Sequence, residues 1–261
     1  MSPVHRLATT ADLASATAHH PVVVLDVGTG FRPPAYAAAS PERRAAPLAV
    51  AFHRRSDHGV RGSAVLGTAS GLAVLLDDPE VREWVTGGGN RHLSVPRGTV
   101  GVVSERLDLG TRGGDWDWMW TRREPQVVPG EEAVRVIGPE IRAEVEEFLD
   151  AHSPRTHGQP FARPGQHWVG VRSRADGSLV AVGGSEPSQG GTPTLAGIAV
   201  AGHRRGEGWG AAVTAHLTRR AVRGWGACAL GMFADNDDAR RVYLRLGFTT
   251  GMEWTSRWFQ R

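Results

Sequence analysis

The stretch from Ile198 to Ala211, IAVAGHRRGEGWGA, determines how the second half of the chain is interpreted. A short apolar segment runs into a loop that carries Gly206, Gly208 and Gly210, and the loop opens directly into a helical pattern. Glycines let the backbone approach a phosphate closely, and the free N–H groups of a helix N-terminus point toward it. Two arginines beside the loop add positive charge. The pattern indicates an anion-binding loop, although a plain strand–turn–helix connection has the same outline.

A second stretch, Asn236 to Phe248, reads NDDARRVYLRLGF. Either Asp237 or Asp238 can cap a helix over residues 239–246, which the glycine after it would close. This helix carries one of the only two tyrosines in the chain, Tyr243. A catalytic tyrosine and a half-buried packing residue are both consistent with that position.

Together the two stretches resemble the GCN5-related N-acetyltransferase (GNAT) family. The first matches the family's R-x-x-G-x-G at residues 205–210, and the second matches N-x-x-A-x-x-x-Y-x-x-x-G-F at 236–248. The resemblance covers about Val134 to Phe259, which is half of the chain. It implies an α/β (α+β) fold with a mixed central sheet flanked by helices.

The resemblance also implies a site for acetyl-CoA or another acyl-CoA as cosubstrate, without a metal. Strand backbone would pair with the pantetheine arm, N–H groups of the loop would hold the pyrophosphate, and Asn236 would bond the pantetheine unless it is only a turn or N-cap residue. The cofactor-binding residues implied are Ile198, Ala199, Val200, Arg205, Gly206, Gly208, Trp209, Gly210, Ala211, Asn236 and Ala239. Tyr243 would protonate the leaving thiolate.

The mechanism implied is direct attack of a neutral amine on the thioester, in which a tetrahedral oxyanion forms and CoA leaves. Many family members place a glutamate on or beside the motif strand to deprotonate the amine. The segment Thr194 to Val200 contains no Glu, Asp or His. Glu186 and His203 are nearby candidates for the base, and deprotonation through water or by bulk solvent is an equal alternative.

The remaining pattern divides the chain into residues 1–121, a linker at 122–130 (RREPQVVPG) and residues 131–261. In the second half we expect strands at 133–137, 168–172, 179–183, 194–200, 227–233 and within 252–259, and helices at 139–151 and 208–223, the latter closed by Gly224. Trp116, Trp118 and Trp120 alternate with period two, which predicts a strand with an aromatic face for core or interface packing. Cys228 is expected to be a buried small residue.

The first half predicts strands at 4–7, 22–27 and 47–52 and helices at 10–19 and 78–85. The strand–helix order at its start repeats that of the second half, so we expect two tandem GNAT-like halves, the first a degenerate copy. This half would shape the acceptor site or mimic a dimer partner, and both a monomer and a homodimer are consistent with it.

The composition excludes several classes of protein. The 261 residues have a net charge of +3, and all 30 basic residues are arginines spread along the chain, which disfavours a nucleic-acid-binding stripe. One cysteine excludes an internal disulfide framework or a Cys-based zinc site, and His53 and His58 are expected to be solvated loop histidines rather than metal ligands. The absence of a long apolar run and of a signal-like start predicts no membrane span and a cytoplasmic location.

Two alternatives to an acyltransferase follow from the residues. The segment VVVLDVGTGF, Val22 to Phe31, looks like the strand and glycine turn of S-adenosylmethionine-dependent methyltransferases, but Pro33 and Pro34 interrupt the helix that should follow. A non-catalytic acyl-CoA-binding regulatory module is the other. The sequence does not identify the acceptor: a small amine, an amino acid, an antibiotic-like metabolite, a protein N-terminus and an aminoacyl group on tRNA are all consistent with it.

Overall fold

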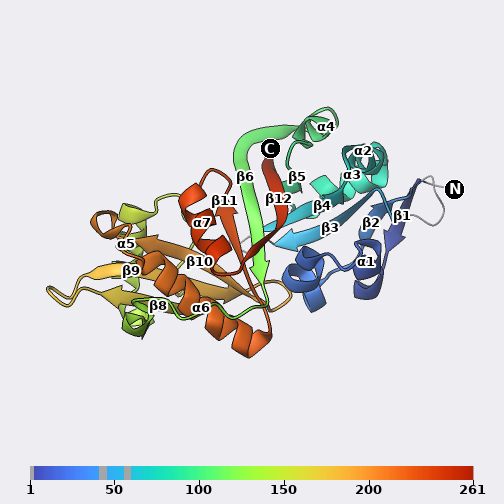
Figure 1. Ribbon diagram of the computed structural model, residues 1–261. Coiled ribbons are helices and arrows are strands. Elements are labelled where there is room, and N and C mark those ends of the chain that lie inside the picture. The colour runs from blue at the N-terminus through green and yellow to red at the C-terminus, as the bar shows by residue number, and fades with distance from the viewer. Residues whose placement is uncertain (1–2, 41–45, 56–59, 261) are drawn as a thin grey trace.

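A computed structural model describes residues 3–40, 46–55 and 60–260 of the chain. In this part of the chain, twelve strands form one continuous mixed sheet with helices on both faces (Figure 1). The strands of the first half are β1 (Val4–Leu7), β2 (Ala35–Ala38), β3 (Ala49–Arg55), β4 (Arg61–Gly67), β5 (His92–Pro96) and β6 (Leu109–Thr121). Those of the second half are β7 (Arg135–Ile137), β8 (His167–Arg172), β9 (Leu179–Pro187), β10 (Pro193–Val200), β11 (Cys228–Phe233) and β12 (Thr249–Phe259).

The helices lie between strands in the same order in both halves. The α-helices are α1 (Thr10–Ala16), α2 (Ala69–Asp77), α3 (Pro79–Thr86), α4 (Val100–Ser104), α5 (Arg142–His152), α6 (Trp209–Trp225) and α7 (Asp237–Arg245). A π-helix, η1 (Val22–Val27), and short 3₁₀ helices, η2 (Gly28–Gly30), η3 (Glu131–Ala133), η4 (Pro139–Ile141) and η5 (Gly202–Arg204), complete the set.

The sheet order, β1-β2-β3-β4-β5-β12-β6-β11-β10-β9-β8-β7, has an internal twofold pattern. In each half four antiparallel strands are followed by a fifth that runs parallel to the fourth. The sixth strand of each half then pairs with the fifth strand of the other half, so β12 lies against β5 and β6 lies against β11. The expected tandem architecture is confirmed, and Figure 1 shows the exchanged strands β6 and β12 side by side at the centre. Because both halves contribute to the centre of the sheet, neither completes its part of the sheet without the other.

The tryptophan alternation on β6 has the packing role that its period predicts. Trp118 is fully buried in a cluster with Trp254, Phe52 and the apolar residues of η1, and Trp116 and Trp120 pack against that cluster. The opposite face of β6 presents Met119 to a second cluster beneath α6 and α7. The central strand therefore joins two cores, one on each face of the sheet.

A buried carboxylate ties this central strand to α7. Asp117, on β6, has no exposed surface and forms ion pairs with both Arg97 and Arg240. Arg97 follows β5 of the first half, whereas Arg240 lies on α7 and also donates to the carbonyl of Ala234 at 2.8 Å. The first half of the chain thereby fixes the helix that carries Tyr243.

The segment 22–27, expected to be a strand, is a helix. Five of its six side chains are buried, and Pro21 at its N-terminus already has helical dihedral angles. A short apolar run does not by itself distinguish a buried strand from a buried helix, which is why the prediction was wrong. The methyltransferase alternative loses its structural premise, because these residues hold no strand that leads into a glycine turn.

The glycines after this helix serve a contact between the two halves. The loop between β9 and β10 docks on them: Gly190 N donates to Asp26 O at 2.7 Å and Gln189 Nε2 donates to Gly30 O at 2.8 Å. A Cβ atom on Gly30 would lie 2.0 Å from the carbonyl oxygen of Gln189, so only glycine fits there. Close backbone approach, rather than S-adenosylmethionine binding, accounts for this glycine.

Several smaller expectations also need correction. Helix α6 ends at Trp225 and is closed by Gly226, with φ +75°, two residues after the predicted closure at Gly224. Strand β7 begins at residue 135 because 131–133 form a 3₁₀ turn. His53 is a buried residue of β3, stacked on Trp84 and hydrogen-bonded to Arg61, rather than a solvated loop residue. His58 lies outside the described residues, and Cys228 is buried as expected.

None of the described helices has the length and apolarity that a membrane crossing requires. Within the same residues, no group of three or more His, Cys, Asp or Glu side chains is arranged to hold a metal ion.

Candidate functional site

A cavity opens where the parallel strands β10 and β11 separate. The two strands pair only at residues 194–195 of β10 and 229–230 of β11, and beyond these residues they diverge. The diverging parts, from Ala196 to Ile198 and from Gly231 to Phe233, line a cavity of about 380 Å³. Backbone groups on the inner edges of both strands are thus available to a ligand that enters between them.

A bulge in β10 shapes one wall of this cavity. The pairing with β9 shifts register between Ala196 and Ala199, and Gly197 at the shift has a φ of +63°. A Cβ atom there would meet the Trp168 ring at 2.5 Å, so both conformation and packing require glycine. Strand periodicity alone cannot show such a bulge, but a glycine inside a strand pattern is its usual sequence signal.

The first half of the chain and β12 form the opposite wall. The lining residues from these parts are Arg54, His92, Ser94, Arg112, Gly113, Gly114, Asp115, Trp116, Ser256 and Trp258. Trp116 Nε1 donates to Ser256 Oγ at 2.8 Å, and Ser256 Oγ lies 2.7 Å from Ser94 Oγ. The cavity is therefore shared between the halves, and sequence reasoning found none of this wall except the tryptophan face.

The glycine-rich loop leads into α6 as the sequence predicts. Gly206 and Gly208 both have positive φ, and a Cβ atom at either would have nothing within 4 Å, so the space beside the loop is open. No side chain caps α6, whose first helical bond runs from Ala212 N to Gly208 O at 3.0 Å. The N–H groups of Trp209, Gly210 and Ala211 therefore precede the helical ladder, at the positive end of the helix dipole.

Side chains around this loop are more engaged than the sequence suggests. Arg204 is paired with Glu207, and its hydrogen bond lowers the pKa of Glu207 to about 2. Trp209 Nε1 donates to the same carboxylate at 3.0 Å, while Arg205 donates to the carbonyl of His152 at 2.8 Å. Anion binding at this loop would rest on backbone N–H groups rather than on the arginines beside it.

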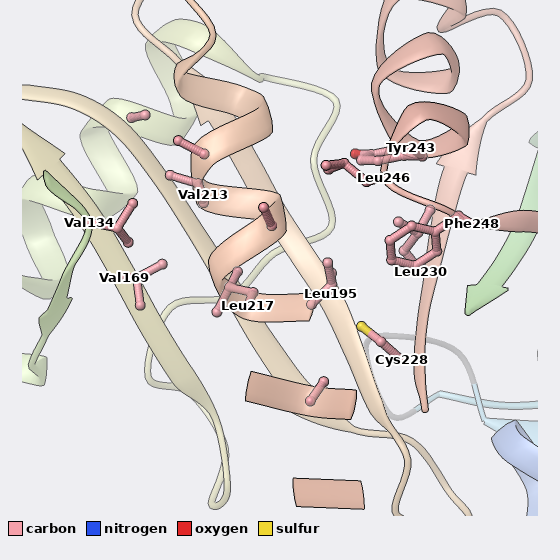
Figure 2. Packing of buried hydrophobic residues seen from close by; sticks show 14 of the residues in the cluster. Val134, Val169, Leu195, Val213, Leu217, Cys228, Leu230, Tyr243, Leu246 and Phe248 are labelled. Atoms are coloured by element: carbon pink, nitrogen blue, oxygen red, sulfur yellow. The ribbon is translucent and has the colours of Figure 1, made fainter. Parts of the chain in front are cut away.

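Tyr243 projects from α7 into the space between that helix and α6, near Leu246 and Phe248 (Figure 2). Its side chain lines the cavity and is otherwise buried among apolar residues. This burial raises the pKa of Tyr243 to about 12, so the phenol keeps its proton at neutral pH. The residue lies where it could donate a proton inside the cavity.

Asn236 both lines the cavity and caps α7. Its Oδ1 accepts a hydrogen bond from the Ala239 N–H at 3.2 Å, so Asn236 is the N-cap in place of the expected Asp237 or Asp238. The cap occupies only the side-chain carbonyl oxygen. Ala239 is half-buried against the core beneath α7.

The two candidate bases named from the sequence lie elsewhere. Glu186 accepts hydrogen bonds from Arg163 and from Gln166 Nε2, the latter at 2.7 Å. His203 is an exposed residue of η5. Neither is among the described residues that line the cavity, whereas His92, His157 and Asp115 are.

Comparisons with known proteins agree with this arrangement. The family model described as Acetyltransferase (GNAT) family matches residues 136–248. A Drosophila protein of known structure aligns with a TM-score of 0.58 at 14% identity and covers 99% of both chains. A GCN5-related N-acetyltransferase from Kribbella flavida aligns at 0.53 and 17% identity, covering 98% of this chain and 97% of its own. A putative GNAT acetyltransferase from Novosphingobium aromaticivorans aligns at 0.51 and 17%, covering 94% and 95%.

No curated protein matches the chain. The structural matches extend over nearly the whole length at identities that show the fold alone, and the family model covers the half that contains α6, α7 and the divergence of β10 from β11. Residues 136–248 thus form a domain of the acetyltransferase (GNAT) family, within a chain whose full length has the fold of these proteins.

Proposed function

We propose that the protein transfers an acyl group from an acyl-CoA, with acetyl-CoA as the preferred donor, to a primary amine. The amine attacks the thioester directly while donor and acceptor are both bound in a ternary complex. The observation that carries this proposal is the cavity between β10 and β11, which reaches from Tyr243 to a wall built by the other half of the chain. A donor bound from the side of α6 and an acceptor bound against the shared wall would meet there.

The residues present suit an acyl-CoA donor. The open loop at Gly206 and Gly208 and the uncapped start of α6 offer backbone N–H groups to a pyrophosphate. The inner edge of β10 beyond Leu195 has no partner on β11, so it can pair with an extended amide-bearing arm. A Cβ atom on Gly210 would make only an ordinary van der Waals contact with Val200, at 3.5 Å, so the first turn of α6 lies close to the end of β10.

Tyr243 supplies the acid in this proposal. When the amine nitrogen bonds to the thioester carbon, the C–S bond breaks and the sulfur carries the electron pair away as a thiolate. A phenol with its pKa raised to about 12 is protonated before the reaction and can give that thiolate its proton. The amine loses its own proton to solvent or to a group on the cavity wall.

Tyr243→Phe separates this role from packing, because it keeps the ring and removes the donor. We expect single-turnover acyl transfer to slow by about a hundredfold, the lower end of the range for a positioned acid, since a CoA thiolate can also leave unassisted. The acyl-CoA dissociation constant should change little in a parallel titration. Full activity with unchanged binding would show that Tyr243 only packs and that the leaving thiolate takes its proton from another group or from water.

A further inference from the structure

The carboxylates and guanidinium groups on the cavity wall suggest what the acceptor must carry. Three such side chains line the cavity, those of Arg54, Arg112 and Asp115. Arg54 forms an ion pair with Asp26, and both are buried. Within the described part of the chain, Arg112 and Asp115 take part in no ion pair. One positive and one negative group therefore line the cavity without a charged partner among the described residues.

Arg112 is held in place by an aromatic ring rather than by a carboxylate. Its guanidinium carbon lies 3.8 Å from the centroid of the Trp258 ring, a cation–π contact that leaves the in-plane N–H groups directed away from the ring face. A planar guanidinium in this position matches the two oxygens of a carboxylate.

Asp115 is fixed by its neighbours on the central strands. Thr255 Oγ1, on β12, donates to Asp115 Oδ1 at 2.7 Å, and the Asp115 carbonyl accepts from Ala234 N at 3.0 Å. The second carboxylate oxygen has no partner among the described residues. Asp115 also lines a more open hollow that adjoins the cavity, so a cation can reach it from solvent.

Both side chains lie where β11 ends beside β6. Strand β11 pairs with β6 over residues 116–121 and Ala234 still bonds the Asp115 carbonyl, so beyond Asp115 residues 112–114 have, among the described strands, only β12 beside them. Arg112 stacks on Trp258 and Asp115 bonds Thr255, and these last two partners lie on opposite faces of β12. A ligand therefore contacts both charged groups by passing Gly113 and Gly114, which carry no side chain. Along the strand the two Cα atoms are about 10 Å apart, at about 3.3 Å per residue.

We propose that the acceptor is an amine that also carries a carboxylate, such as an amino acid, with Arg112 binding the carboxylate and Asp115 binding the ammonium group before transfer. This inference rests on the proposed function and names the acceptor class for the same cavity. A simple alkylamine would satisfy Asp115 and leave Arg112 without a partner, so it should bind more weakly.

The test compares acceptors in pairs. Amino acids with one to five methylene groups between amine and carboxylate are each assayed with acetyl-CoA beside the alkylamine of equal length. The wild-type protein should favour at least one carboxylated member by about tenfold to a hundredfold in kcat/KM, the size of a charge-assisted hydrogen-bonded contact. In Arg112→Gln this preference should disappear because KM for the carboxylated acceptor rises. In Arg112→Lys the preference should return in part, since lysine restores the positive charge.

Two matched variants serve as controls. Arg174→Gln removes a positive charge, as Arg112→Gln does, but at an exposed turn outside the cavity. Asp108→Asn removes a negative charge, as Asp115→Asn does, but at an exposed residue just before β6 that does not line the cavity. Neither should alter the preference, whereas Asp115→Asn should raise KM for amines with and without a carboxylate. Calorimetric binding of the N-acetylated amino acid in the presence of CoA should weaken in Arg112→Gln, which gives a readout independent of turnover.

The outcomes separate the two proposals. Acylation of amines without preference for a carboxylated member, or a preference that survives Arg112→Gln, would overturn the acceptor assignment and leave the acyltransferase proposal standing. Absence of any acylation, with acetyl-CoA bound, would instead remove the proposed function on which the acceptor assignment rests.

Discussion

Replacement of Asp117 by asparagine tests the connection between the two halves. Asparagine has nearly the shape of aspartate and keeps one acceptor oxygen, but it removes the negative charge that faces Arg97 and Arg240. Asp117 has no exposed surface, so the loss leaves two guanidinium groups without their buried counter-ion. Removal of one partner from a buried ion pair costs about 3–5 kcal/mol, and we expect the lower end, about 3 kcal/mol, because both arginines are partly exposed and can be rehydrated.

For a chain of this size, 1 kcal/mol corresponds to about 2 °C, so the midpoint of thermal unfolding should fall by about 6 °C in calorimetry. The matched control is Asp238→Asn, which removes the carboxylate of a largely exposed pair with Arg241 on the same helix and should change the midpoint by no more than about 2 °C. An Asp117→Asn midpoint within about 1 °C of the wild type would refute the view that this carboxylate holds α7 to the central strand.

Three further predictions concern the donor loop, the contact between the halves and pH. Gly208→Asp should weaken acyl-CoA binding by more than about tenfold, because it places a carboxylate beside the bound pyrophosphate. Gly226→Asp, the same change in a left-handed residue at the other end of α6, should not weaken it, and equal affinities of the two variants in calorimetry would contradict the loop assignment. Gly30→Ala should lower the free energy of unfolding in urea by about 1–3 kcal/mol, because the new Cβ atom meets a backbone carbonyl. Gly101→Ala, where the Cβ atom would point into open space on α4, should not lower it. An unchanged free energy of unfolding in Gly30→Ala would disprove the close contact. Burial lowers the pKa of His53 to about 4, below its value in the unfolded chain, so the free energy of unfolding of the wild type should fall as the pH falls from 6.5 toward 4. His53→Gln should lose less stability over the same range. Parallel plots of unfolding free energy against pH for the two proteins would show that His53 is solvated.

Much of the second half follows from its sequence because local signals and tertiary structure agree there. The glycines before α6 and the apolar residues Trp209, Val213, Leu217 and Ala221, which recur every four residues, predict the start and the course of the helix that the structure has. The segment 22–27 shows where this agreement ends: an apolar run of six residues fits both a strand and a helix, and its packing beneath α1 decides.

The cavity wall could not be predicted from local patterns. Arg112, Asp115, Ser94 and Ser256 come from three strands that are adjacent only because β6 and β12 exchange between the halves. Hydrophobic periodicity specifies which face of a strand is buried but not which strand pairs with it. The repeat of strand and helix at the start of each half predicted the duplication, yet nothing in it indicated the exchange.

The measurement that tests the central claim most directly is mass spectrometry of the wild-type protein incubated with acetyl-CoA and the panel of amines. We predict that at least one amine is converted to its acetamide, with free CoA released in equal amount. Acetyl-CoA bound without any acetamide formed would identify a binding module, and CoA released without acetamide would identify hydrolysis; either result would contradict acyl transfer to an amine.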